Sequence, residues 1–285
     1  MKTRWMGTAA LAVLCLGSAG WIAQAEEIIG IAHVALRASD LDREVNFLGK
    51  LGFEESFTNV QDGKVLQVFV KINDLQFVEV YPQTDPSQPL GLMHICYEVD
   101  DLKGLNKLYV QHGLKPTPVR TAAAGNLLFS LADPDGRTIE FTQYMPGSRQ
   151  MQDRGNHLGV QRVADELLGL ELPVKDMAAA KSFYSTLGFN ETPEGANLRL
   201  SISANAGLRI ELHPVRVGDA PELLFPVADA RGATTELRRA KLKVDRNNKL
   251  VFVRDPDGNS FVFLETSNAA PESHRIEHLI PWRHK

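Results

Sequence analysis

Two histidines and two glutamates recur in this sequence at one spacing. His33 lies in the segment IIGIAHVAL and His94 in GLMHICYEV, and each is followed 46 residues later by a glutamate, Glu79 and Glu140 respectively. Two neutral imidazoles and two carboxylates can bind Zn²⁺, Ni²⁺, Co²⁺, Mn²⁺ or Fe²⁺ and leave room for water or substrate oxygens. The spacing predicts a duplicated module in which histidine and glutamate repeat in the same register, and both residue types are common metal ligands.

A metal held in this way could polarise a substrate carbonyl while a nearby carboxylate removes the adjacent proton. Glu79 and Glu140 are therefore candidate catalytic residues as well as candidate ligands. Arg37 follows His33 on the same predicted strand face, and its planar guanidinium suits a substrate carboxylate. An ordinary salt bridge is the alternative for Arg37.

The segments around the histidines explain how they would be positioned. In residues 28–38, apolar residues alternate with His33 and Arg37, which is typical of a strand with one apolar face. At Asp40 the period changes to that of a helix, and Gly52 is placed to end it. Three further strands follow, so the module is predicted to be strand, helix and three strands.

The pattern occurs four times, in two pairs. Residues 28–145 contain the first pair, and residues 167–266 repeat the pattern in LLGLELPVKDMAAAKSFYSTLGF and DPDGNSFVF. The polar segment 146–166 is interpreted as a linker and residues 267–285 as a C-terminal tail. We expect an α+β fold of four βαβββ modules paired into two open β-barrel domains.

The second pair lacks most of the predicted metal ligands. Alignment of the repeats puts four other residues at those positions: Gly169, Glu211, Glu222 and Val262. Without imidazole this half should not hold a transition metal tightly. A structural lobe is the favoured interpretation, and a metal-free binding cleft is the alternative.

Residues 1–25 have the features of a secretory signal peptide. Lys2 and Arg4 precede the apolar run of residues 9–21, and Ala23-Gln24-Ala25 forms a cleavage site. The sequence thus predicts an exported protein, periplasmic or secreted, with no membrane attachment after cleavage. An uncleaved N-terminal anchor is the alternative.

The composition limits the partners. The 285 residues carry a formal charge of −4 and show no basic cluster, so no nucleic-acid partner is expected. A small-molecule substrate is the expected partner, and the sequence does not indicate an oligomeric state.

The modules resemble the vicinal oxygen chelate superfamily, which includes glyoxalase I, methylmalonyl-CoA epimerase, extradiol dioxygenases and the bleomycin- and fosfomycin-resistance proteins. In that family a divalent metal is held by the first and last strands of each module, which implies His33, Glu79, His94 and Glu140 as its ligands here. The set His, Glu, His, Glu, together with Arg37 and the sequence DPDGxxIE, looks most like glyoxalase I. The segment MHICYEVDDL looks equally like the epimerase branch.

Three functions follow from these observations. The first is a metal-dependent lyase, isomerase or epimerase that acts through a metal-stabilised enolate on a small carbonyl substrate. The second is an extradiol-type dioxygenase with His33, His94 and Glu140 as ligands, against which Glu79 argues if it is a fourth ligand. The third is a non-catalytic binding protein of the resistance type. Glutathione and coenzyme A adducts are cytosolic, so export would imply a different substrate.

The cleavage site predicts a mature N-terminus at Glu26, because the A-x-A motif ends at Ala25. Intact-mass measurement of the exported protein tests this prediction. Membrane-bound material that still begins at Met1 or Lys2 would instead support the anchor.

Overall fold

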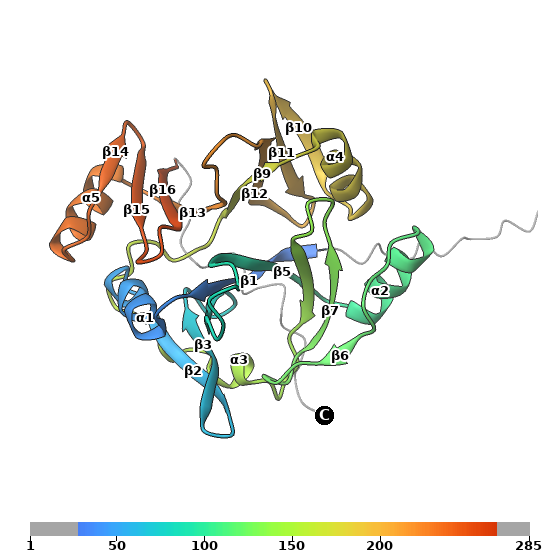
Figure 1. Cartoon of the computed structure of the whole chain (residues 1–285), viewed down its shortest axis with the longest axis horizontal. Coiled ribbons are helices and arrows are strands. Elements are labelled where there is room, and N and C mark those ends of the chain that lie inside the picture. The colour runs from blue at the N-terminus through green and yellow to red at the C-terminus, as the bar shows by residue number, and fades with distance from the viewer. Residues whose placement is uncertain (1–27, 267–285) are drawn as a thin grey trace, which may run out of the picture.

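The computed structural model describes residues 28–266, so the predicted leader and tail lie outside the described residues. This part of the chain forms two eight-stranded sheets with a few short helices, one sheet in each half (Figure 1). The α+β prediction with two paired-module domains is confirmed. No helix within residues 28–266 has the length and apolar character needed to cross a membrane.

The first half contains two copies of the predicted module. Module 1 comprises β1 Ile28–Ala38, α1 Leu41–Lys50, β2 Glu54–Gln61, β3 Lys64–Lys71 and β4 Phe77–Pro82. Module 2 comprises β5 Gly91–Val99, α2 Leu102–Gln111, β6 Arg120–Thr121, β7 Leu127–Ala132 and β8 Thr138–Gln143.

The second half repeats the same order. Module 3 comprises β9 Gly169–Val174, α4 Met177–Thr186, β10 Asn190–Glu194, β11 Asn197–Ile202 and β12 Asn205–Pro214. Module 4 comprises β13 Glu222–Val227, α5 Ala230–Arg239, β14 Asp245–Asn247, β15 Leu250–Arg254 and β16 Ser260–Glu265.

The first strands of the two paired modules lie side by side at the centre of each sheet. The strand order is β2-β3-β4-β1-β5-β8-β7-β6 in the first half and β10-β11-β12-β9-β13-β16-β15-β14 in the second. The strand β1 runs parallel to β4 and antiparallel to β5, and β5 runs parallel to β8. The four strands predicted to carry ligands are therefore neighbours.

Helix α1 begins and ends where the sequence predicts. The Asp40 carboxylate accepts a hydrogen bond from the Arg43 backbone N–H at 3.0 Å, which caps the first turn. Gly52 has φ +85°, and a Cβ at that position would lie 2.2 Å from the Gln161 carbonyl oxygen. Glycine is thus required both by the backbone conformation and by the close approach of the segment that joins the halves.

That joining segment packs against the first sheet. It contains the short helix α3 Arg149–Gln152, and its backbone accepts hydrogen bonds from the fully buried Lys71 ammonium at the Asp153 and Asn156 carbonyl oxygens, at 2.6 and 2.7 Å. The Asp153 carboxylate lies 3.1 Å from the same ammonium. A buried charge needs such partners, so the segment is a fixed part of the first half.

The two halves meet at two related junctions. At one, the Ser39 backbone N–H donates to Asp257 at 2.7 Å, and the Phe47 and Phe261 rings pack edge to face at 5.1 Å. At the other, the Lys175 backbone N–H donates to Asp135 at 3.2 Å. One hydrophobic core cluster includes buried residues of both halves.

The junctions differ in charge. The Asp135 loop contains Arg137, which lies 3.0 Å from Asp133 and 3.4 Å from Asp135. At the α1 junction, Asn259 occupies the place of that arginine, and the buried Glu44 faces Asp255 and Asp257.

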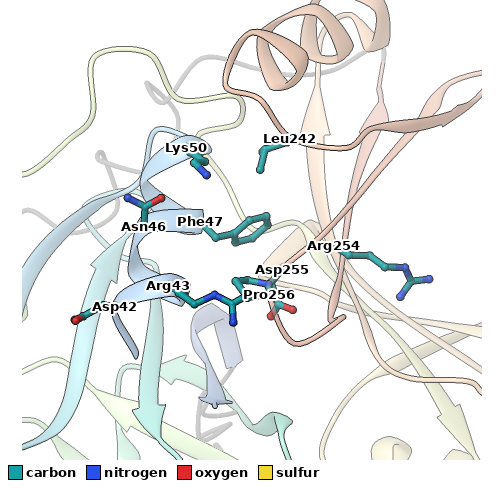
Figure 2. Close-up of a pocket in the computed structure, with 9 residues that line it drawn as sticks. All are labelled: Asp42, Arg43, Asn46, Phe47, Lys50, Leu242, Arg254, Asp255 and Pro256. Atoms are coloured by element: carbon teal, nitrogen blue, oxygen red, sulfur yellow. The ribbon is translucent and has the colours of Figure 1, made fainter. Parts of the chain in front are cut away.

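Burial and the two aspartates raise the pKa of Glu44 from 4.5 to about 9. Figure 2 shows the groove beside this junction, where Phe47 of α1 lies against Asp255 and Pro256. Glu44 is only 1% exposed. The folded protein therefore holds a proton here at neutral pH that the unfolded chain releases.

We expect the contribution of Glu44 to stability to fall as the pH rises from about 4.5 to 9, because the folded state binds the extra proton throughout that window. Glu44→Gln should raise the melting temperature by several degrees at pH 8.5 and by much less at pH 5. Thermal unfolding of both proteins at the two pH values provides the measurement.

The matched control is Asp42→Asn, which changes an exposed carboxylate on the same helix. Its effect on the melting temperature should be equal at pH 5 and pH 8.5. An equal effect of Glu44→Gln at both pH values would contradict the prediction.

Candidate metal centre

The pairing of four central strands brings the predicted ligands to one face. Ala35 on β1 lies opposite Glu79 on β4 and opposite His94 on β5, while Cys96 on β5 lies opposite Glu140 on β8. His33 is two positions from Ala35 and shares its face. The four side chains therefore converge from four adjacent strands, as the repeat spacing predicts.

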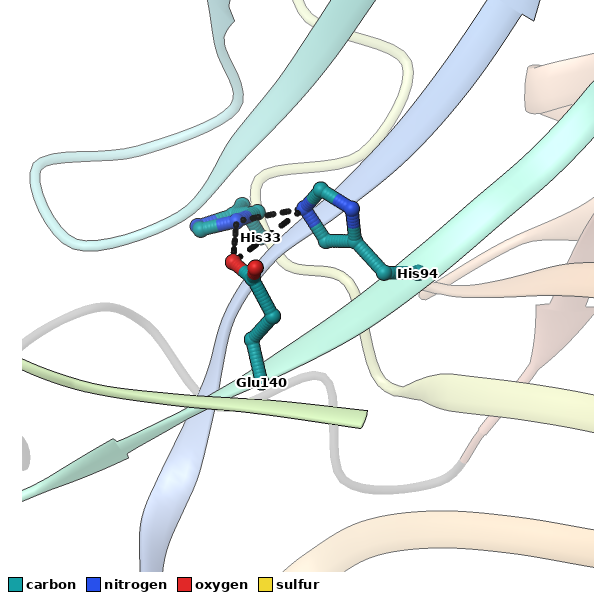
Figure 3. Close-up of side chains that lie close together, drawn as sticks. All are labelled: His33, His94 and Glu140. Carbon is teal, nitrogen blue, oxygen red and sulfur yellow. Dashed lines mark hydrogen bonds and ion pairs between the residues drawn. The ribbon is translucent and has the colours of Figure 1, made fainter. Parts of the chain in front are cut away.

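Three of the four ligand-type side chains form a compact group (Figure 3). The Nε2 atoms of His33 and His94 lie 3.2 Å apart, and Glu140 Oε2 lies 3.9 Å from the first and 3.5 Å from the second. Within residues 28–266, this is the group whose donor atoms all lie within 4.8 Å of one another. We call His33, His94 and Glu140 the triad.

The triad fits a divalent metal ion. Ligand atoms 2.0–2.2 Å from one ion and at right angles to each other lie about 3 Å apart, close to the observed separations. Burial lowers the pKa of His94 to about 4 and, together with the proximity of His94, places the pKa of His33 well below 6.5. Both imidazoles are therefore neutral at pH 7, which is the form that binds metals.

Glu79 lies beside the triad and is not part of it. Its Oε1 atom is 3.4 Å from His33 Nε2, while Oε2 accepts hydrogen bonds from the Tyr81 hydroxyl at 3.0 Å and from Gln67 Nε2 at 3.2 Å. Burial raises the pKa of Glu79 to about 8. The structure thus brings together three of the four predicted ligands and places the fourth as a neighbouring carboxylate.

The strands beside the two glutamates explain this difference. Tyr81 and Gln67 of module 1 correspond to Thr142 and Leu128 of module 2, each 61 residues later. The Thr142 hydroxyl instead donates to the Leu127 carbonyl oxygen at 3.0 Å, and leucine has no donor. Glu79 is therefore held by two donors that have no counterpart at Glu140.

A cavity of about 150 Å³ opens at this site. His33, Glu79 and Glu140 line it together with Arg120 and Asn59. Burial raises the pKa of Glu140, and the positive charge of Arg120 partly offsets this effect.

Arg37 does not line the cavity, and its guanidinium donates to the Pro89 carbonyl oxygen at 2.9 Å. The structure does not bring Arg37 to the triad, and the sequence reasoning missed Arg120. A signal was present, since Asn59 and Arg120 are 61 residues apart, as are His33 and His94.

The second half has the predicted residues in the corresponding register. Glu211 lies opposite Glu171, which in turn lies opposite Glu222, and Leu224 lies opposite Val262. A Cβ at Gly169 would lie 1.5 Å from the Arg209 carbonyl oxygen, so the backbone leaves no room for histidine at that position.

Glu211 in the second half is paired with two arginines. Its Oε1 atom forms an ion pair with Arg209 and lies 3.7 Å from Arg199 Nε. The position that corresponds to Glu79 is thus neutralised by protein cations, which supports the interpretation of this half as a structural lobe.

The fold and the site can be compared with known proteins. Residues 30–141 match the family model described as the Glyoxalase/Bleomycin resistance protein/Dioxygenase superfamily. No curated protein matches the sequence of the chain. The match covers the first half of the chain, and it confirms the resemblance seen in the sequence.

Similar solved structures include two dioxygenases and a glyoxalase. A catechol 2,3-dioxygenase is 18% identical with a TM-score of 0.66, covering 86% of this chain and 90% of that chain. The 2,3-dioxygenase LapB from Pseudomonas sp. KL28 is 18% identical with a TM-score of 0.65, covering 85% and 93%. The Mn(II)-bound glyoxalase from Novosphingobium aromaticivorans is 15% identical with a TM-score of 0.65, covering 84% and 83%. These likenesses show the shared two-domain fold.

Replacement of a triad histidine by alanine should reduce bound metal at least tenfold, because only two of the three triad ligands would remain. Elemental analysis after loading with Zn²⁺, Ni²⁺, Co²⁺, Mn²⁺ and Fe²⁺ in turn tests His33→Ala and His94→Ala. Glu140→Gln should weaken binding more than Glu79→Gln, since Glu79 lies outside the triad.

Glu211→Gln and Glu222→Gln in the second half serve as controls and should leave metal content unchanged. Wild-type protein that carries less than one metal ion per chain under all five loading conditions would contradict the metal centre.

Proposed function

We propose that the protein is a divalent-metal-dependent enzyme, a lyase or isomerase, that removes a proton beside a carbonyl group of a small substrate in the first-half cavity. The observation that carries this proposal is the position of Glu79. It is a buried carboxylate that adjoins the metal-binding triad without belonging to it.

The triad holds the metal in this proposal. Bound there, a divalent ion would supply Lewis acidity toward a substrate oxygen and so make the adjacent C–H more acidic. His33, His94 and Glu140 would hold the ion. The superfamily match and the neutral imidazoles support this assignment.

Glu79 is the proposed base, in the ionised form that the positive charge of a bound divalent ion would favour by lowering the raised pKa of this carboxyl. Tyr81 and Gln67 both donate to its Oε2 atom, so the carboxylate is held in one orientation and Oε1 remains on the side of His33. A base fixed at such a position needs little reorganisation to accept a substrate proton. Glu140, the other carboxylate predicted to be catalytic, then acts mainly as a ligand.

The cavity supports a small substrate. A volume of about 150 Å³ accommodates a compound of a few carbon atoms, and the walls shield it from bulk water. We also propose that the protein acts after export. A small metabolite in the export compartment then fits the protein better than a cytosolic glutathione or coenzyme A adduct.

Extradiol-type ring cleavage is the second candidate. Two histidines and one carboxylate form the ligand set typical of non-haem Fe(II) oxygenases. Because Glu79 lies outside the triad, it does not occupy a ligand position that catechol and dioxygen would need. Against this candidate, His33 is the one histidine among the residues lining the cavity, so no separate acid–base histidine is present there.

The two reactions are distinguished by solvent isotope exchange. The metal-loaded protein should wash deuterium from D₂O into the carbon beside the carbonyl of a small hydroxyketone such as hydroxyacetone, as measured by NMR. Glu79→Gln should slow this exchange by about 10²-fold or more with bound metal largely retained, because glutamine cannot accept the proton.

Glu211→Gln is the matched control and should exchange at the wild-type rate. Oxygen consumption with catechols, together with no exchange into any hydroxycarbonyl compound, would replace the proposed reaction by ring cleavage.

A further inference from the structure

Two polar side chains lie on the edge strands of the first sheet and line the same cavity. Asn59 is on β2 and Arg120 on β6, at opposite ends of the strand order. Asn59 lies opposite Gln67, and Arg120 lies opposite Leu128. Both pairs face the cavity that contains Glu79 and Glu140.

The positions of Asn59 and Arg120 are related by the module duplication. They are 61 residues apart, the separation that also relates His33 to His94. The local symmetry that forms the metal centre therefore also places this second pair. Unlike the histidines, the two members differ, one being a neutral amide and the other a cation.

Asn59 has an unused hydrogen-bond donor. It is 7% exposed, and its Oδ1 atom accepts a hydrogen bond from Arg149 Nη1 at 2.6 Å, which fixes the orientation of the amide. Its Nδ2 atom has no acceptor among the described residues. A buried N–H without an acceptor is costly, so this position favours a ligand that brings an oxygen atom.

The support behind Asn59 is rigid. Arg149 also donates to the Thr58 carbonyl oxygen at 3.0 Å, and its guanidinium lies 4.2 Å from the centre of the Phe57 ring. Both contacts hold the arginine in place and, through it, the Asn59 amide. The donor is therefore preorganised before a ligand arrives.

The positive charge of Arg120 acts on Glu140 without a direct ion pair. Within residues 28–266 the Arg120 side chain makes no ion pair within 4 Å, and it lies at the exposed edge of the cavity. Arg37, by contrast, is committed to the Pro89 carbonyl oxygen. A guanidinium at the rim of a small cavity suits a carboxylate, which accepts two parallel hydrogen bonds.

We propose that Arg120 and Asn59 form a carboxylate-binding subsite, so that the substrates are small acids whose two neighbouring oxygens reach the triad and whose separate carboxylate binds at this subsite. The statement that two neighbouring substrate oxygens reach the triad rests on the proposed function. The carboxylate subsite rests only on the contacts of Asn59 and Arg120.

Three 2-hydroxy acids test the subsite by calorimetric titration of the metal-loaded full chain. Glycolate and lactate carry one carboxylate beside a hydroxyl group, and malate carries the same pair plus a second carboxylate. Malate should bind at least tenfold more tightly than lactate. Arg120→Ala should remove this advantage while weakening lactate binding much less than malate binding, and Arg120→Lys should restore part of the advantage.

Asn59→Asp removes the Nδ2 donor and keeps the contact with Arg149, because aspartate still accepts the hydrogen bond from that residue. It should weaken malate binding more than lactate binding, since the donor is replaced by a negative charge. Arg37→Ala is the matched control and should retain the full preference for malate. Melting curves of all variants establish that each is folded.

Equal affinity for malate and lactate in the wild-type protein would overturn the subsite, as would a preference that survives Arg120→Ala. If Arg37→Ala alone lost the preference for malate, Arg37 and not Arg120 would bind the second carboxylate. These titrations need no turnover, so failure of deuterium exchange with intact malate selectivity would reject the proposed reaction and keep the subsite.

Discussion

The antiparallel pairing of β1 with β5 is the constraint on which the first half depends. It joins two copies of one module about a local twofold axis, with Ala35 opposite His94 and His33 opposite Cys96. The two Nε2 atoms are thereby brought to 3.2 Å although the residues are 61 positions apart. Because side chains alternate along a strand, a register slip of one residue would turn one histidine into the hydrophobic core.

The second half shows that this pairing does not itself create a metal centre. The strands β9 and β13 pair in the same sense, but Gly169 and Val262 stand where the first half has His33 and Glu140. The Arg209 carbonyl oxygen lies so close to Gly169 that no side chain fits there. The charge of Glu211 is balanced by Arg209 and Arg199. This half instead contributes loops and aromatic rings to the junctions, so the fold and the chemistry are separable in one chain.

Within the first half, local differences between the modules give equivalent residues different contacts. Glu79 and Glu140 have the same register, yet Tyr81 and Gln67 donate hydrogen bonds to Glu79 Oε2, which leaves Oε1 beside His33, while the Thr142 hydroxyl donates to the Leu127 carbonyl oxygen. A symmetric strand frame thus supports an asymmetric arrangement of the two glutamates.

The sequence by itself determined the module, its four copies, the helix caps and the face on which the histidines lie, because strand and helix periods and repeat spacing are local properties of the chain. It also located the three triad residues, because the two copies of the module carry histidine and glutamate at equivalent positions. Only the tertiary structure decided three other contacts. Glu79 accepts a hydrogen bond from Tyr81, Arg37 donates to the Pro89 carbonyl oxygen, and Glu44 is buried against the other half. Those outcomes depend on where long side chains extend and on which donors are nearest in space, and neither is encoded in the period of the pattern.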